Sequence, residues 1–148
     1  MRYIKKIQLL TSCIAVLGLM WACQEPDENF VHDTNVISSM MCFSSAETMQ
    51  YNGEIHEYDK DGNIIPADSI TQARAEGGYG LILFRIPTTV SEELVLSDVQ
   101  LAAAVSFDEM ITPSLSGRHN IGTEEGIIIT VTSGVGTTRQ YRIRGMYE

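Results

Sequence analysis

The sequence predicts an all-β domain, built as a sandwich of about seven short antiparallel strands. Three observations predict it. After residue 35, apolar side chains alternate with polar ones at a spacing of two residues rather than 3.6. Two runs, at 80–86 and 127–132, are rich in β-branched and apolar residues. Turn residues separate these segments, and several short strands divided by turns are typical of a sandwich.

The clearest alternation lies in the middle of the chain. Every second residue of a strand points to the same side of its sheet. The residues that share the apolar side here are Val99, Leu101, Ala103, Val105 and Phe107. This pattern predicts a half-buried strand with all five side chains facing the core.

A second alternation ends the chain. Tyr141, Ile143 and Tyr147 share one side and are expected to face the core. The arginines of this segment are assigned to the solvent face of the strand rather than to a binding patch; they are Arg139, Arg142 and Arg144.

The remaining elements follow from local composition. The runs at 80–86 and 127–132 are expected to be central strands, with weaker strands over 36–43, 49–58 and 110–115. Pro87 closes the first central strand, and residues 133–136 form the turn after the second. Only residues 66–76 have the composition for a helical turn, which Gly77 and Gly78 would end.

The N-terminus predicts an export signal. Arg2, Lys5 and Lys6 precede an apolar stretch over 7–21, which is the layout of a signal peptide. This stretch is shorter than the about 20 apolar residues that span a bilayer. A cleaved signal is therefore favoured over an uncleaved anchor, and an ordinary secretory signal is the other alternative.

Residues 19–23, Leu-Met-Trp-Ala-Cys, resemble a bacterial lipobox, in which a small residue precedes a cysteine. Trp21 is bulkier than the residue usual at its position. The resemblance implies cleavage after Ala22 and lipid on Cys23, whose thiolate would take the diacylglyceryl group. Two or more acyl chains anchor a protein stably to a membrane. The predicted organisation is a signal peptide over 1–22, the lipidated cysteine and an acidic tether over 23–34, and the sandwich over 35–148.

Charge and cysteine content narrow the function further. The formal charge is −9, and removal of Arg2, Lys5 and Lys6 with the signal gives −9 − 3 = −12. So negative a protein is not expected to bind nucleic acid, which needs lysine and arginine against phosphate. Once Cys23 is lipidated, only Cys42 keeps a free thiol, so no intramolecular disulfide is expected. Cys42 is interpreted as a small buried apolar residue.

Several stretches together resemble a known domain. They are Phe-Arg-Ile-Pro at 84–87, the alternating strand at 96–106, Ile-Thr-Pro-Ser-Leu-Ser-Gly at 111–117, Ile-Ile-Ile-Thr-Val-Thr at 127–132 and Arg-Gln-Tyr-Arg-Ile-Arg at 139–144. In this order they look like the uncharacterised bacterial Ig-like domain of surface lipoproteins in Bacteroidota-type bacteria. The resemblance covers 35–148, with an insertion over 64–78 and Ser-Gly-Val-Gly at 133–136 in place of an Asp-Gly turn. It implies an Ig-like fold and brings no catalytic residues.

The acidic residues after Cys23 resemble the surface-export signal of the same group of lipoproteins; they are Glu25, Asp27 and Glu28. Solvation alone is the alternative explanation for them. An outer-membrane lipoprotein exposed at the cell surface is therefore expected.

Three local patterns carry possible chemistry. Asp59, Asp61 and Asn63 around Gly62 resemble part of a calcium loop, but no glutamate closes the loop, and a hairpin turn is the alternative. Asp68-Ser69-Ile70 fits the three-residue O-glycosylation pattern of Bacteroidota-type envelope proteins, which makes Ser69 a candidate acceptor. The histidines lack zinc-binding spacing; they are His32, His56 and His119. No cofactor, metal or catalytic residue is predicted.

Two non-catalytic functions remain. The first is adhesion or protein–protein assembly in the envelope, through edge strands and end loops. The alternative is an accessory glycan-binding lipoprotein of a polysaccharide-uptake system. Sugar rings usually stack on exposed aromatic side chains, and the single tryptophan, Trp21, lies in the signal. The candidate sugar-binding residues are therefore Tyr51, Tyr58 and Tyr79.

Overall fold

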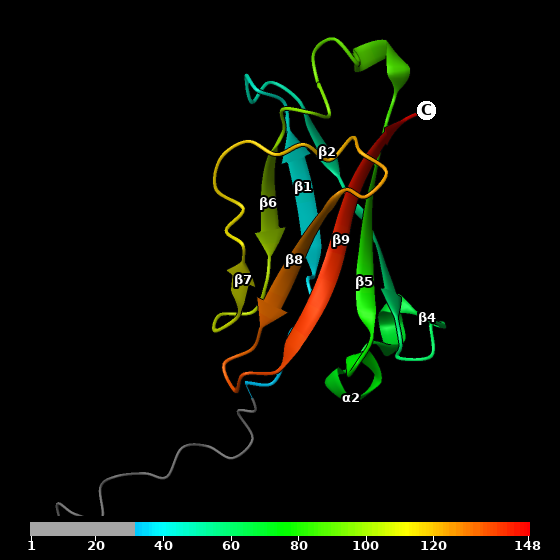
Figure 1. Ribbon diagram of the computed structural model, residues 1–148, viewed down its shortest axis with the longest axis vertical. Coiled ribbons are helices and arrows are strands. Elements are labelled where there is room, and N and C mark those ends of the chain that lie inside the picture. The colour runs from blue at the N-terminus through cyan, green and yellow to red at the C-terminus, as the bar shows by residue number, and fades with distance from the viewer. Residues whose placement is uncertain (1–31) are drawn as a thin grey trace, which may run out of the picture. The chain divides into compact units, whose positions relative to one another are not determined.

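The computed structural model describes residues 32–148, which form two facing β-sheets (Figure 1). Sheet A has the strand order β2-β1-β6. Its strands are β1 (Ser39–Phe43), β2 (Gln50–Asn52) and β6 (Gln100–Ala104). Sheet B has the order β4-β3-β5-β9-β8-β7. Its strands are β3 (Glu54–Tyr58), β4 (Ile64–Ile65), β5 (Tyr79–Ile86), β7 (Met110–Thr112), β8 (Ile127–Thr132) and β9 (Thr138–Tyr147).

The core lies between the two sheets. The inward residues of both sheets form one buried cluster, which includes Met40, Cys42 and Leu101 from sheet A and Ile82, Phe84, Ile129, Tyr141 and Ile143 from sheet B. Apolar residues at every second position give each strand one apolar side. The two sheets bury these apolar sides against each other. The predicted all-β sandwich is therefore confirmed.

The two central strands are also confirmed, but the prediction of a wholly antiparallel fold is wrong. β5 lies between β3 and β9, and β8 lies between β9 and β7. β5 and β9 pair in parallel, from Tyr79 opposite Gln140 to Ile86 opposite Tyr147. A parallel pair needs a long connection, and here the chain passes through sheet A and back to β7 and β8 before β9 forms.

The segment expected as one strand over 49–58 is two strands in different sheets. The chain crosses at Gly53, so that β2 pairs with β1 and β3 pairs with β5. A Cβ atom on Gly53 would lie 2.6 Å from Cγ2 of Ile82. The crossing therefore needs a residue without a side chain.

Two predicted core residues are not in the core. Phe107 is fully exposed, because β6 ends at Ala104 and the chain turns at 106–109. In this turn the Glu109 carboxylate accepts a hydrogen bond from the Ser106 amide at 2.7 Å. Tyr147, at the end of β9, is 39% exposed and donates its hydroxyl to the Leu94 carbonyl at 3.0 Å.

The expected helical turn is present between β4 and β5. It consists of a 3₁₀ turn, η1 (Ala67–Ser69), and a single turn of helix, α2 (Gln72–Ala75). Gly77 follows with φ of +69°, a conformation that favours glycine at the end of a helix. A second 3₁₀ turn, η2 (Thr88–Val90), follows Pro87 after β5.

Candidate functional site

The outer face of sheet B carries two of the three tyrosines that were candidates for sugar binding. Tyr58 on β3 is directly opposite Tyr79 on β5, which in turn is opposite Gln140 on β9. The two tyrosine rings are stacked, with centroids 4.8 Å apart and planes 13° from parallel. Tyr79 is 49% exposed. Directly opposed aromatic side chains stabilise neighbouring strands, and here they also present an aromatic surface.

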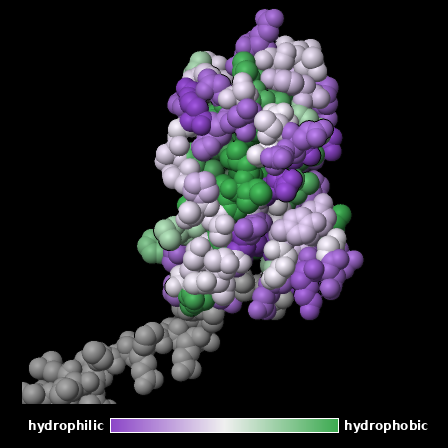
Figure 2. Space-filling view, viewed as in Figure 1, coloured by the Kyte–Doolittle hydropathy of each residue, from purple (hydrophilic) through white to green (hydrophobic). Residues whose placement is uncertain are grey.

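Beside this pair lies a hollow of about 540 Å³, which we call the tyrosine groove. Its lining comes from four neighbouring strands and comprises Tyr58, Tyr79, Gly80, Leu81, Ile128, Gln140, Tyr141, Arg142 and Arg144. Figure 2 shows hydrophobic surface gathered in the middle of this side of the molecule, with hydrophilic surface around it. A hollow that combines aromatic and apolar side chains with polar groups is typical of a ligand site.

Two arginines on β9 give the tyrosine groove a positive charge. Arg142 and Arg144 are two residues apart and therefore lie on the same side of the strand. Within residues 32–148, no carboxylate lies within ion-pair distance of either guanidinium. The Nε atom of Arg144 is buried and has no hydrogen-bond partner in this part of the chain. Two uncompensated cations in so acidic a protein are suited to an anionic ligand.

The groove continues past Arg144. This residue also lines a second hollow of about 490 Å³, whose other walls are formed by residues 95–97, 120, 122–124 and 145–147. The two hollows therefore share Arg144 as a lining residue. An arrangement of this kind suits an extended ligand better than a compact one.

Arg139 lies on the opposite, inward side of β9, so its assignment to the solvent face is wrong. It is 2% exposed. Its Nε and Nη2 atoms lie 2.8 and 2.7 Å from Oε2 of Glu57, which is 6% exposed. A buried charge is tolerated when it is paired and fully hydrogen bonded, as it is here.

The buried arginine also holds the backbone of the stacked tyrosines. Its Nη2 atom donates to the carbonyls of Tyr58 and Tyr79 at 2.8 and 3.0 Å. Nη1 donates to the carbonyl of Ala75 in α2. Arg139 thus fixes three backbone segments against one another directly beneath the tyrosine groove.

Tyr141 completes the buried cluster. Its hydroxyl donates to Oε1 of Glu57 and accepts a hydrogen bond from the amide of Ile37 at 3.0 Å. Burial raises the pKa of Tyr141 above its ordinary value, and the neighbouring Glu57 charge adds to the rise. Burial also raises the pKa of Glu57, against the opposing effect of hydrogen bonds from Tyr141 and Arg139.

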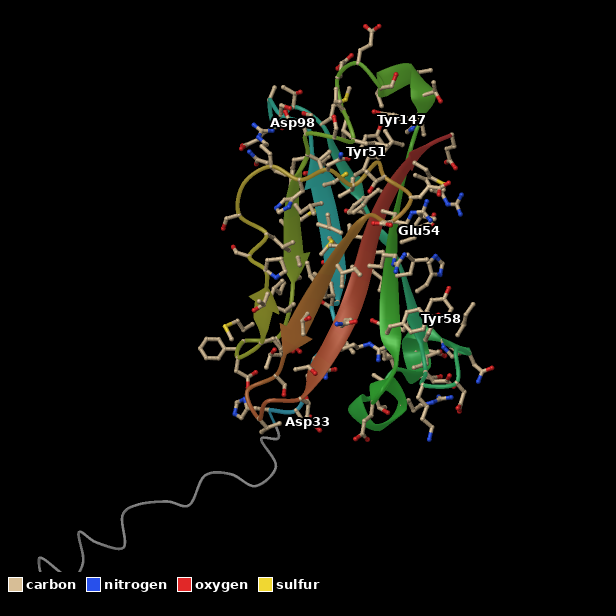
Figure 3. The ribbon with its side chains drawn as sticks, in the orientation of Figure 1. Asp33, Tyr51, Glu54, Tyr58, Asp98 and Tyr147 are labelled. Carbon is tan, nitrogen blue, oxygen red and sulfur yellow. The ribbon has the colours of Figure 1, made fainter. Side chains whose placement is uncertain are left out.

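The third candidate, Tyr51, does not join the other two. It lies on β2, opposite Cys42, and packs against the core cluster from sheet A. Figure 3 shows Tyr51 and Tyr58 in different parts of the fold. The separation follows from the crossing at Gly53, which places β2 and β3 in different sheets.

The calcium candidates form the hairpin turn between β3 and β4. Oδ1 of Asp59 accepts hydrogen bonds from the amides of Asp61 and Asn63 at 2.9 and 2.8 Å. Backbone and side-chain hydrogen bonds from Asn63 lower the pKa of Asp59. Gly62, with φ of +82°, completes the turn. The hairpin alternative is confirmed, and the carboxylate of Asp59 is occupied in closing it.

The other candidates lie apart from the groove. Ser69 ends η1, is partly exposed, and donates its hydroxyl to the side chain of Asp68 at 3.2 Å. His32 lies 2.6 Å from Asp108, and His119 contacts the carbonyl of Leu115 at 3.0 Å. Among the described residues, no three His, Cys, Asp or Glu side chains are grouped so as to hold a metal ion.

The predicted lipidation site, Cys23, lies outside the described residues, as do the predicted signal and most of the predicted tether. From residue 32 onward, no helix has the length and apolar character needed to cross a membrane.

Comparisons with known proteins give a weak structural likeness. No protein-family model matches the sequence, and no curated protein matches it either. One solved structure that does match is a protein of Bacteroides fragilis NCTC 9343 that is thought to be secreted. It is 13% identical, the match covers 79% of this chain and 98% of that one, and the TM-score is 0.46.

Proposed function

We propose that this chain is a lipid-anchored, non-catalytic protein of the bacterial cell envelope whose Ig-like domain binds carbohydrate in the tyrosine groove. One observation carries the proposal: a stacked tyrosine pair lies beside two unpaired arginines in a hollow on an open sheet face. The envelope location and the anchor are supported by the predicted export signal and by the resemblance of residues 19–23 to a lipobox.

The groove has the groups that a sugar ring requires. The apolar C–H face of a pyranose packs on an aromatic ring, which Tyr79 offers at 49% exposure. Gln140 supplies amide groups for the sugar hydroxyls. Arg142 and Arg144 supply paired N–H donors that match a carboxylate. An acidic polysaccharide, such as one containing uronic acid, is therefore the ligand class that fits best.

The proposal is tested by affinity electrophoresis on a panel of acidic and neutral polysaccharides. Wild-type protein is expected to be retarded by an acidic polysaccharide, and Tyr79→Ala to lose most of this retardation. Tyr79→Phe keeps the ring and should bind nearly as well. Met110→Ala is the matched control, because Met110 is an exposed apolar residue of sheet B outside the groove. If wild-type protein were retarded by no polysaccharide, the proposal would be wrong.

Adhesion or protein–protein assembly is the second candidate, and the edge of sheet A favours it. β6 is the last strand of this sheet, with Ala102 exposed beside a hollow of about 380 Å³ lined in part by Leu101, Ile111 and Leu115. A partner strand can add to such an edge. A protein partner whose binding is lost in Ala102→Lys but kept in Tyr79→Ala would support assembly instead of glycan binding.

A further inference from the structure

Three exposed apolar side chains lie on or directly beside the two turns next to the point where the chain enters the domain. Phe107, in the turn between β6 and β7, is 104% exposed, which is the full exposure of the residue. Met110, which begins β7, is 62% exposed, and Val135, in the turn between β8 and β9, is 59% exposed. We call these three side chains the tether face.

Contacts of His32 show that both turns adjoin this point. The amide of Val135 donates to the carbonyl of His32 at 3.1 Å. Nδ1 of His32 lies 2.6 Å from Oδ2 of Asp108, the residue after Phe107. The hydroxyl of Thr137 holds the carbonyl of Asp33 at 3.0 Å. The start of the domain is therefore fixed between Phe107 and Val135.

The acidic side chains of the Phe107 turn are used inside the domain. Asp108 pairs with His32, and the carboxylate of Glu109 accepts a hydrogen bond from the amide of Ser106 at 2.7 Å. These bonds hold the turn in a shape that turns Phe107 outward. Because Phe107 is fully exposed, it buries no apolar area within the domain and does not stabilise the fold. Exposed apolar side chains that lie together are typical of a surface that binds a partner.

The length of the tether limits what this surface can meet. Eight residues, 24–31, separate Cys23 from His32. A fully extended segment of this length spans about 30 Å. If acyl chains on Cys23 lie in a bilayer, His32, which adjoins the tether face, is kept within about that distance of the lipid. A contact too weak to form in free solution becomes intramolecular under such a tether.

We propose that the tether face rests on the lipid surface that anchors Cys23, with Phe107 and Val135 placed among the lipid head groups. This inference rests on the proposed lipidation. Aromatic side chains are favoured at the membrane interface. Because the contact is apolar, it should form on zwitterionic lipid and persist at high salt. This placement would leave the opposite end of the domain, where Asp98 lies in Figure 3, away from the lipid.

The protein provides a sensitive test, since its single tryptophan, Trp21, is removed with the signal. Phe107→Trp and Val135→Trp each place one tryptophan on the tether face of the mature lipoprotein. Val95→Trp is the matched control. Val95 is 42% exposed, and its carbonyl accepts a hydrogen bond at 2.9 Å from the amide of Asp98. Asp98 lies at the far end of the domain from Asp33 in Figure 3. Each purified lipoprotein is reconstituted into phosphatidylcholine vesicles with or without bromine on the acyl chains.

We expect the emission of Phe107→Trp and Val135→Trp to shift to the blue and to be quenched by brominated lipid, at low and high salt. Val95→Trp should show neither effect. If vesicle-bound Phe107→Trp behaved like Val95→Trp, the inference would be overturned while the anchor stood. A blue shift without quenching by lipid would also overturn it, because a second protein surface would then cover the tether face. If the lipoprotein did not float with vesicles at all, both the anchor and the inference would fail.

Discussion

β9 carries arginines on both of its sides, and the two sides use them differently. Arg139 points into the sandwich, where Glu57 and three backbone carbonyls satisfy it. Arg142 and Arg144 point outward into the tyrosine groove and have no carboxylate partner among residues 32–148. The same residue type is thus structural on one side of the strand and available to a ligand on the other.

Burial explains the difference. A buried charge without partners is strongly destabilising, so an inward arginine must be fully satisfied within the fold. A charge on the outer face has no such requirement, because water stabilises its exposed atoms, although the Nε atom of Arg144 is itself buried. Outward arginines that keep no partner are therefore free to bind an anion. The predictions below test this contrast, first on the inward side and then on the outward side.

The largest effect is expected from Arg139→Met. This change leaves the Glu57 carboxylate buried without its cation and frees the carbonyls of Tyr58 and Tyr79. Breaking a buried pair in this way costs about 3–5 kcal/mol of the free energy of unfolding. Urea denaturation measures it. The double variant Arg139→Met/Glu57→Gln should recover part of the loss, since it removes the isolated charge. Equal stability of wild type and Arg139→Met would contradict the structural role.

Tyr141→Phe should have the next largest effect. The change removes the hydroxyl that donates to Glu57 and accepts from the amide of Ile37. A buried group left unsatisfied costs about 1–3 kcal/mol. Tyr79→Phe is the control on the outer face, and its unfolding free energy should stay within about 0.5 kcal/mol of wild type. Similar losses in both variants would mean that the two sides of sheet B do not differ as described.

Much of this arrangement follows from the sequence, because a period of two separates the two sides of each strand. The alternation that places Tyr141 and Ile143 inside also places Arg139 inside, two residues earlier. Arg139 was nevertheless assigned to the solvent face, because it carries a charge. What satisfies that charge is Glu57, which is 82 positions away in the sequence. Alternation within one strand does not reveal a partner on another strand.

The tyrosine groove was predictable only in part. Tyr58 and Tyr79 stand out as aromatic residues of the predicted domain, but their stacking depends on the register between β3 and β5. Long-range register is set by the packing of the whole sandwich. Strand ends are equally hard to predict, as Phe107 shows: the alternation continues through it although β6 has already ended at Ala104.

On the outward side, the double variant Arg142→Gln/Arg144→Gln should unfold with a free energy within about 0.5 kcal/mol of wild type. Its affinity for an acidic polysaccharide should fall by at least about tenfold, because charge-assisted hydrogen bonds are lost. Wild-type binding should weaken with added salt, and the remaining binding of the variant should not. Arg85→Gln is the matched control, since Arg85 lies on the same face and pairs with Glu54 at 3.2 Å. If the double variant bound as tightly as wild type, the arginines would have no part in binding.

The last prediction concerns the reactivity of the Cys42 thiol, on the inward side of sheet A, and involves no change in stability. Its side chain is fully buried, and burial raises its pKa to about 11. At pH 8 only about 0.1% of such a thiol is thiolate, the reactive form. Native protein should therefore not react with iodoacetamide over hours, whereas unfolded protein should. Cleavage at the predicted site would leave two cysteines, Cys23 and Cys42. If Cys23 is lipidated, only Cys42 has a free thiol, and iodoacetamide should modify one cysteine per unfolded chain. Modification of two cysteines would mean that Cys23 carries no lipid.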